Sequence, residues 1–165
     1  MRRRRGSILL ENVMYVPVLI LLLMGTIELA RVSYTYYSLQ KTLYTIARYV
    51  GTRQGVNFCD TADATVQAAK NFAITGDVDN GSQGFIQGLT ADQIEVRVER
   101  VDSSSGAVGE CACDTTGCDT ANGGQGPDFI VVSIPAGYPI RLSIPQLPLD
   151  PILLRPHVRL PYQGT

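Results

Sequence analysis

The sequence contains a single histidine, His157, and lacks the short motifs that mark common enzyme sites. It has no glycine-rich phosphate loop, no recognisable nucleophile motif and no pair of carboxylates in an apolar setting. His157 lies between Pro156 and Val158, in a segment that alternates like an edge strand and has no nucleophile nearby in the sequence. We therefore expect a surface or interface histidine, no cofactor and no enzymatic activity. Nothing in the sequence supports the alternative that the chain is an enzyme tethered to a membrane.

The chain also lacks an excess of positive charge outside its first five residues. Its 165 residues include 14 Lys and Arg against 15 Asp and Glu, which gives a formal net charge of −1. Four of those cations are Arg2 to Arg5, so the side chains that follow Gly6 carry a net charge of −5. Binding to nucleic acid requires Lys and Arg gathered on the folded surface. The composition therefore argues against a nucleic-acid partner.

Charge is absent altogether from Asn12 to Ile27, a run of 16 residues. At about 1.5 Å per residue this run covers roughly 24 Å, and the whole stretch from Ser7 to Leu29 is long enough to cross a bilayer. A cleaved signal peptide has a similar basic start and apolar middle, but no small-residue cleavage site follows the apolar run here. The Arg block predicts a cytoplasmic N-terminus. We therefore expect a single-pass inner-membrane protein in contact with membrane lipid, its remainder in the periplasm.

Helical periodicity continues beyond the apolar run. Apolar residues recur every three or four positions as far as Val50, and no Gly or Pro interrupts them before Gly51. Pro17, inside the span, is expected to kink the helix or open its backbone ladder locally. The predicted organisation has three parts: a basic leader at 1–6, a transmembrane and spine helix at 7–53, and a head at 54–165.

The head reads as an α+β domain. A short helix is predicted from residue 61 or 62 to about residue 74, with Asp60 or Thr61 as its cap and Gly76 at its end. Alternating or continuous apolar runs predict three or four antiparallel strands. We expect the short helix to pack on the sheet that these strands form. The predicted strands lie near 94–99, 129–134, 140–144 and 158–160.

Four cysteines occur in the head, and three of them lie in a Ser-, Gly-, Asp- and Asn-rich loop at 102–127. An even number of cysteines in an oxidising compartment favours two disulfides. Neighbours of the Cys-x-Cys type are hard to join to each other, so we expect Cys118 to pair with one of them and Cys59 with the other. Structural zinc sites favour paired CxxC spacings, which these four positions do not have. The cysteines are Cys59, Cys111, Cys113 and Cys118.

One other segment resembles a metal-binding loop. Asp77-Val78-Asp79-Asn80-Gly81 is similar to the start of a calcium loop, but the Gly comes one place early and no Glu stands at the twelfth position. A turn is the better interpretation, and no metal site is expected.

The boundary of the apolar run carries a pair of opposite charges and a group of tyrosines. Glu28 and Arg31 are three residues apart and can form an ion pair where the helix leaves the membrane. Tyr34, Tyr36 and Tyr37 suit an aromatic belt at the same boundary.

Several N-terminal motifs together resemble the TadE-like family of the tight-adherence (Tad/Flp) pilus system, whose members are similar to type IV pilins. The resemblance covers about the first fifty residues and implies a pilin-like fold and a role as a minor pilin or pseudopilin in pilus assembly. The motifs are Arg5-Gly6-Ser7-Ile8-Leu9-Leu10-Glu11, Pro17, Gly25-Thr26-Ile27-Glu28-Leu29-Ala30-Arg31, Tyr36-Tyr37-Ser38-Leu39-Gln40 and Ala47-Arg48-Tyr49.

The same resemblance implies a processing site and partners. A prepilin peptidase would cut between Gly6 and Ser7, which makes Glu11 the fifth residue of the mature chain and gives it a role in assembly. The implied partners are that peptidase, other pilin or pseudopilin subunits and an inner-membrane assembly platform, with incorporation into an extracellular pilus as one outcome. The alternative is a single-pass membrane adaptor that is never processed.

Glu11 also stands out on physical grounds, because it lies among apolar residues. A carboxylate at the bilayer centre costs about 2.5–3.5 kcal/mol, so Glu11 needs a partner or a place near the interface. A free amine on Ser7 would lie one helical turn away in the same chain, and in a neighbouring protomer it would fix the axial stagger of packed helices. The other interpretation is that Glu11 reaches back to the lipid head groups.

Overall fold

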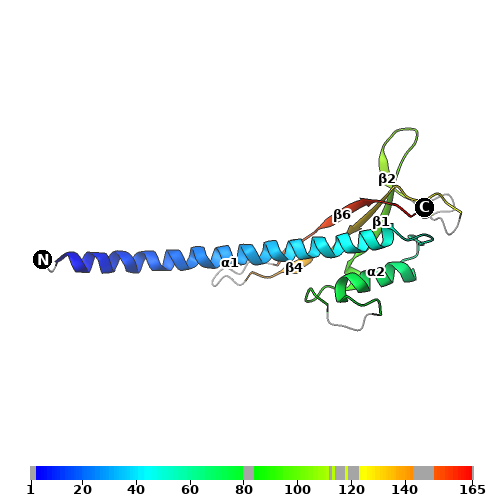
Figure 1. The fold of residues 1–165 in the computed structure, drawn as a ribbon. Coiled ribbons are helices and arrows are strands. Elements are labelled where there is room, and N and C mark those ends of the chain that lie inside the picture. Colours follow the sequence, from blue (N-terminus) through cyan, green and yellow to red (C-terminus); the bar gives the residue numbers. More distant parts are fainter. Residues whose placement is uncertain are drawn as a thin grey trace.

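The computed structural model describes residues 3–79, 84–111, 113, 118, 123–142 and 151–164, with side chains from Val13 onward. It shows an α+β fold in which one long N-terminal helix extends far beyond a small head (Figure 1), as the sequence predicts. The elements are α1 (Arg3–Gly51), α2 (Ala64–Thr75), the 3₁₀ helix η1 (Ala91–Gln93), β1 (Glu95–Val101), β2 (Val108–Glu110), β3 (Phe129–Ser133), β4 (Tyr138–Ile140), β5 (Ile152–Leu154) and β6 (His157–Pro161).

Helix α1 contains 49 residues, which at about 1.5 Å per residue makes it roughly 74 Å long. It runs through Pro17 as one element. The kink or local opening of the backbone ladder that the sequence predicts at Pro17 stays a prediction. Proline removes a single backbone donor, and the hydrogen bonds on either side of it keep the helix continuous. The helix begins inside the basic leader and ends at Gly51, two residues before the predicted limit.

Helix α2 starts later than the sequence suggested. Its cap is Asp63, whose carboxylate accepts hydrogen bonds from the backbone N–H groups of Thr65 and Val66 at 2.8 and 3.1 Å. The predicted caps Asp60 and Thr61 belong to the turn before it, where the Asp60 carboxylate accepts from the backbone of Ala62. The prediction of Gly76 as the end is confirmed, because Gly76 takes a φ of 82° that glycine adopts without steric cost.

The main sheet has four antiparallel strands in the order β2-β1-β3-β6. The central strand β3 pairs with β1 on one side, where Val98 faces Ile130, and with β6 on the other, where Leu160 faces Ile130. Predictions for β1, for β3 and for a final edge strand at β6 are therefore confirmed. Pro161 ends β6 at the sheet edge, where a missing N–H costs no ladder bond.

Two parts of the predicted sheet were wrong. The loop at 102–127 contains β2, which forms a hairpin with β1 and aligns Val101 with Val108. The strand predicted at 140–144 ends at Ile140 and belongs to a separate two-stranded sheet of β4 and β5, in which Ile140 faces Ile152. Positions 143 and 144 of that prediction lie outside the described residues.

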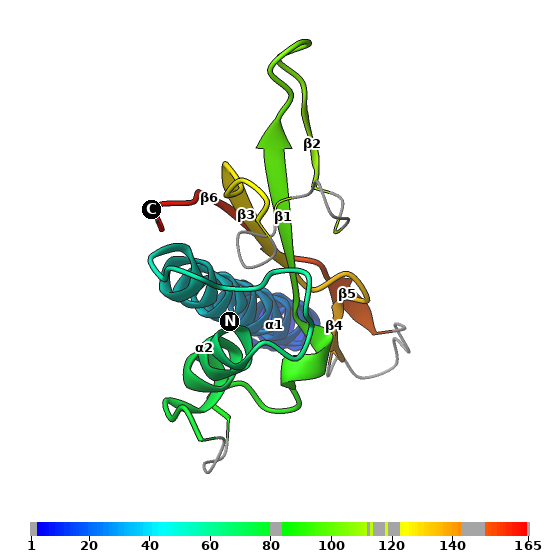
Figure 2. The ribbon, with the colours of Figure 1, turned by 90° about the vertical axis from the view of Figure 1, so that its right-hand side faces the viewer.

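The core of the head lies where α1, α2 and the inner face of the main sheet meet. Viewed along α1, helix α2 lies on one side of it and the sheet on another (Figure 2). The buried residues from all three elements form one apolar cluster, and the contribution of α1 comes only from its second half. These α1 residues, all fully buried, are Leu39, Leu43, Ile46, Ala47 and Val50.

Candidate functional site

The first half of α1 is apolar on every side. Its residues from Val13 to Leu23 are exposed without exception, including Leu22 at 62%. The most apolar window of the helix has a mean hydropathy of 2.2, and the rest of the chain buries none of that window. A helix that is apolar all round needs an apolar environment outside the chain. Within the described residues, this is the one helix long and apolar enough to cross a membrane.

The residues of the predicted processing site lie at the start of this helix. Gly6, Ser7 and Glu11 all fall within α1, and the four-residue spacing of Ser7 and Glu11 corresponds to about one helical turn. Processing at Gly6 and the assembly role of Glu11 stay predictions.

The predicted charge pair forms at the point where the apolar surface ends. The guanidinium Nη1 of Arg31 lies 3.9 Å from Oε1 of Glu28, which makes a long and weak pair. The Glu28 side chain is only 13% exposed, and its second oxygen is buried without a hydrogen-bond partner in the described part of the chain. Tyr34 and Tyr37 follow with 74% and 66% of their surface exposed, as expected for an aromatic belt.

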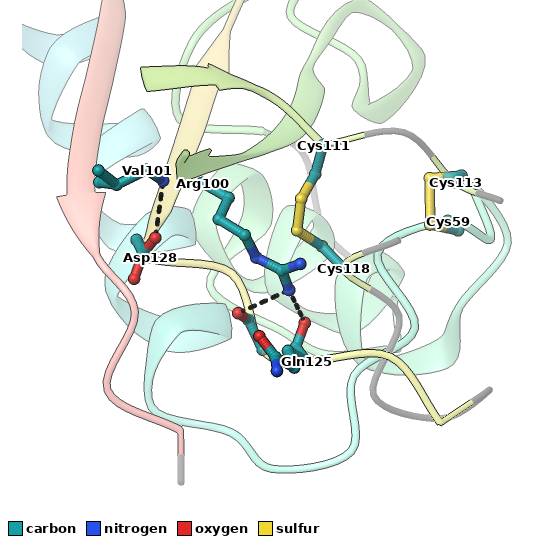
Figure 3. Close-up of a disulfide and its surroundings, with 9 residues drawn as sticks. Cys59, Arg100, Val101, Cys111, Cys113, Cys118, Gln125 and Asp128 are labelled. Carbon is teal, nitrogen blue, oxygen red and sulfur yellow. Dashed lines mark hydrogen bonds between the residues drawn. A yellow bond between two sulfur atoms is a disulfide. The ribbon is translucent and has the colours of Figure 1, made fainter. Parts of the chain in front are cut away.

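The four cysteines form two bridges, Cys59–Cys113 and Cys111–Cys118, whose Cα atoms are 5.4 and 5.7 Å apart (Figure 3). This is one of the two pairings that the sequence left open, in which Cys118 is joined to one member of the Cys-x-Cys pair and Cys59 to the other. Cys118 is fully buried in the core, whereas Cys113 is exposed. The bridges thus fasten the segment after β2 to the core and to the turn before α2.

Hydrogen bonds fasten the end of the same loop to β1. The guanidinium of Arg100 donates to the backbone carbonyls of Gln125 and Gly126, the latter at 3.1 Å (Figure 3). The backbone N–H of Val101 donates to a carboxylate oxygen of Asp128 at 2.8 Å. These contacts hold the chain in position immediately before β3.

Two charged residues that sequence reasoning did not single out have shifted pKa values. Burial of Lys70, on α2, lowers the pKa of its ammonium, and the nearby carboxylates of Asp92 and Glu95 offset part of that shift. Hydrogen bonds from the hydroxyl and backbone of Ser104 and the backbone of Ser105 lower the pKa of Asp102 to about 2. The shift in the pKa of Lys70 depends on tertiary burial, and that of Asp102 depends on the geometry of a turn. The hydrophobic pattern of the sequence reveals neither.

The remaining candidates lie apart from one another. His157 is exposed at the start of β6 and aligns with Ser133, in agreement with a surface histidine. Asp77 and Asp79 form a turn in which the backbone N–H of Asp79 donates to the Asp77 carboxylate at 3.2 Å. Across the described residues, no three His, Cys, Asp or Glu side chains gather as ligands for a metal ion.

Comparison with known proteins gives one match. No curated protein and no solved structure matches the chain. The family model described as TadE-like protein matches residues 6–48, which is almost all of α1 and none of the head. Residues 6–48 of this chain are therefore similar to the TadE-like family, as the motifs around Gly6, Glu11 and Arg31 indicated.

Proposed function

We propose that this chain is a minor pilin or pseudopilin that takes part in assembly of a tight-adherence pilus. The observation that carries the proposal is the construction of α1, whose first half is apolar and uncovered while its second half is the spine of a folded head. The TadE-like match covers both halves of that helix. A chain built this way can be held in a membrane and packed laterally through one continuous element.

Topology follows from the charges at the two ends of the apolar run. The Arg2 to Arg5 block remains in the cytoplasm, and everything beyond Arg31 lies in the periplasm. The two disulfides of the head support this orientation, because such bonds form and persist in oxidising compartments. The head then acts as a structural, non-enzymatic module.

Processing would convert the start of α1 into an assembly element. A prepilin peptidase would cut between Gly6 and Ser7, remove the Arg block and leave a charged amine on Ser7. The carboxylate of Glu11 could then pair with that amine in its own chain or with the amine of a neighbouring subunit. In lipid, this pairing would offset about 2.5–3.5 kcal/mol that an unpaired central carboxylate costs. Neighbouring pilin subunits and an inner-membrane platform would supply the packing partners.

The mass of the mature chain in cell membranes tests the proposal. We expect the protein to begin at Ser7, and a Gly6→Val variant to retain Met1 because the peptidase site is lost. Gly25→Val is the matched control, since it makes the same change in the apolar run at a position with no atom within 4 Å of the added carbon. The control should be processed like the wild type. An intact Met1 in the wild-type protein would instead identify an unprocessed membrane adaptor.

A further inference from the structure

The second half of α1 has a face that the head leaves uncovered. Five residues on it follow one another at alternating spacings of three and four, which places them in one line along the helix. Tyr34 is 74% exposed, and both cations in the line are exposed as well. We call this line the outer stripe. It consists of Tyr34, Tyr37, Lys41, Tyr44 and Arg48.

Two grooves flank the outer stripe at successive points along the helix. On the α2 side a groove of about 810 Å³ lies beside the first part of the stripe, from Tyr34 to Lys41, and is also lined by Phe72 and Phe85. On the β6 side a groove of about 340 Å³ lies beside the last part, at Tyr44 and Arg48, and is also lined by Leu160 and Pro161. Helices pack by placing side-chain ridges of one into grooves of the other, so each groove can receive side chains of a helix laid along the stripe.

The position of the outer stripe restricts where such a helix comes from. The stripe lies on the same helix as the exposed apolar residues that end near Leu29, and it follows them directly. A helix anchored beside α1 in the same membrane can therefore continue along the stripe without changing direction. This continuity favours a parallel, membrane-anchored partner over a protein that approaches from solution.

The charge of the outer stripe restricts what that helix carries. From Leu29 to Cys59 the sequence has no Asp or Glu but has Arg31, Lys41, Arg48 and Arg53. Lys41 and Arg48 form no ion pair within the part of the chain that the structure describes. Parallel pairing of two copies in register would place Lys41 against Lys41 and Arg48 against Arg48. Like charges on facing helices are destabilising, which disfavours a second copy.

We propose that the outer stripe binds the helix of a different protein, anchored in the same membrane and carrying carboxylates about one heptad apart. Lys41 and Arg48 are seven residues apart, or about 10.5 Å along the axis, and two carboxylates at that spacing pair with both cations. Tyr44 between them, and Tyr34 and Tyr37 before them, supply apolar contact area. The proposal rests on the proposed function only in placing both helices in one membrane with the same orientation.

Full-length chains provide the probe. Wild-type protein and a Lys41→Glu/Arg48→Glu variant each carry a donor or acceptor fluorophore at the C-terminus and are incorporated together into phosphatidylcholine liposomes. Energy transfer between the two proteins measures their association. We expect the mixed pair to associate about tenfold more tightly than either protein with itself, because like-charge contacts are replaced by ion pairs. The advantage should shrink as salt is added.

A second variant tests whether the tighter association depends on the outer stripe or only on the change in net charge. Arg97→Glu/Arg155→Glu makes the same change in net charge at exposed positions away from α1, and it should not associate with the wild type more tightly than the wild type does with itself. Circular dichroism and thermal unfolding establish that every variant is folded. Wild-type self-association equal to that of the mixed pair would overturn the proposal, as would an absence of transfer in the mixed pair or an equal gain from the control variant. None of these results depends on cleavage at Gly6, so failure of this proposal is distinguishable from failure of the proposed function.

Discussion

The two halves of α1 are one helix in two different environments. From Val13 to Leu23 every residue is exposed, whereas beyond Leu39 one face is fully buried against α2 and the sheet. The head buries none of the apolar window in the first half, so the stability of that half depends on what surrounds it outside the chain. The second half depends on packing within the chain. A single unbroken helix can therefore couple a membrane anchor to a folded domain while the two remain energetically distinct.

The largest expected effect on this comparison comes from removing the Cys59–Cys113 bridge. The sequence separation of 54 residues implies a loss of about 4 kcal/mol in the free energy of unfolding of the head, by the chain-entropy estimate. Cys59→Ser/Cys113→Ser should therefore lower the midpoint of denaturant unfolding of the head. The helicity of the span in detergent should not change, because none of its window is buried in the head.

The second bridge provides the control for that effect. Cys111→Ser/Cys118→Ser removes a bridge between cysteines only 7 residues apart in the sequence. The chain-entropy estimate then gives a smaller loss, about 2.5 kcal/mol, in the free energy of unfolding. Both variants can be compared by denaturation with far-ultraviolet circular dichroism as the measurement. Loss of helicity in the span on removing either bridge would show that the two halves are not distinct.

Matched leucine substitutions test the comparison within α1 itself. Leu43 is fully buried and Leu22 is 62% exposed. Leu43→Ala should lower the free energy of unfolding of the head by about 2–5 kcal/mol, because it leaves a cavity in a packed core. Leu22→Ala removes the same atoms from a surface that the head does not contact and should leave the unfolding of the head unchanged. Equal losses in denaturant titrations of the two variants would contradict the distinction.

The smallest expected effect concerns Lys70 on α2, which covers the second half of α1. Burial lowers the folded-state pKa of Lys70, so the unfolded chain binds a proton more tightly than the folded chain does. Stability should therefore rise with pH between the lowered folded pKa and the unfolded value of about 10.5. Lys70→Met, which keeps the long apolar stem, should remove this component and stabilise the head by less than about 1 kcal/mol at neutral pH.

Paired unfolding measurements at pH 8 and pH 10 check this expectation. From pH 8 to pH 10 the free energy of unfolding of the wild type should increase relative to that of Lys70→Met, since the variant lacks the titrating amine. Lys41→Met is a suitable comparison, because Lys41 is exposed on α1 and Met at that position changes no buried charge. A larger pH effect from Lys41 than from Lys70 would be inconsistent with burial as the cause.

Strong periodic patterns were enough to predict the long helix, the central strand and both of its partners. Val96 and Val98 alternate with charged residues, and five of the six residues from Phe129 to Ile134 are apolar, so each pattern has one dominant structural solution. The match of residues 6–48 to a family likewise depends on local motifs within α1. The elements that sequence could predict are those whose signal lies in their own residues.

The parts that were missed depend on partners elsewhere in the chain. All three residues of β2 are exposed, so the strand has no buried face to produce alternation and forms because β1 lies beside it. Ile152 to Leu154 follows a proline-rich connector, and its strand exists only through pairing with β4. Asp63 prevailed over Asp60 as the α2 cap because the chain makes a turn first, with the N–H of Asp63 bonded to the Asp60 carbonyl.

The position of β6 has a consequence for the order in which the protein is made. The central strand β3 needs β6 on its outer side, and the N–H of Gln163 donates to the carbonyl of Gly51 at 2.9 Å. A segment that follows β6 thus meets the end of the first helix. During translation, α1 leaves the ribosome long before β6 exists to complete the domain on which its second half packs. The head can close around that half only after β6 has also left the ribosome.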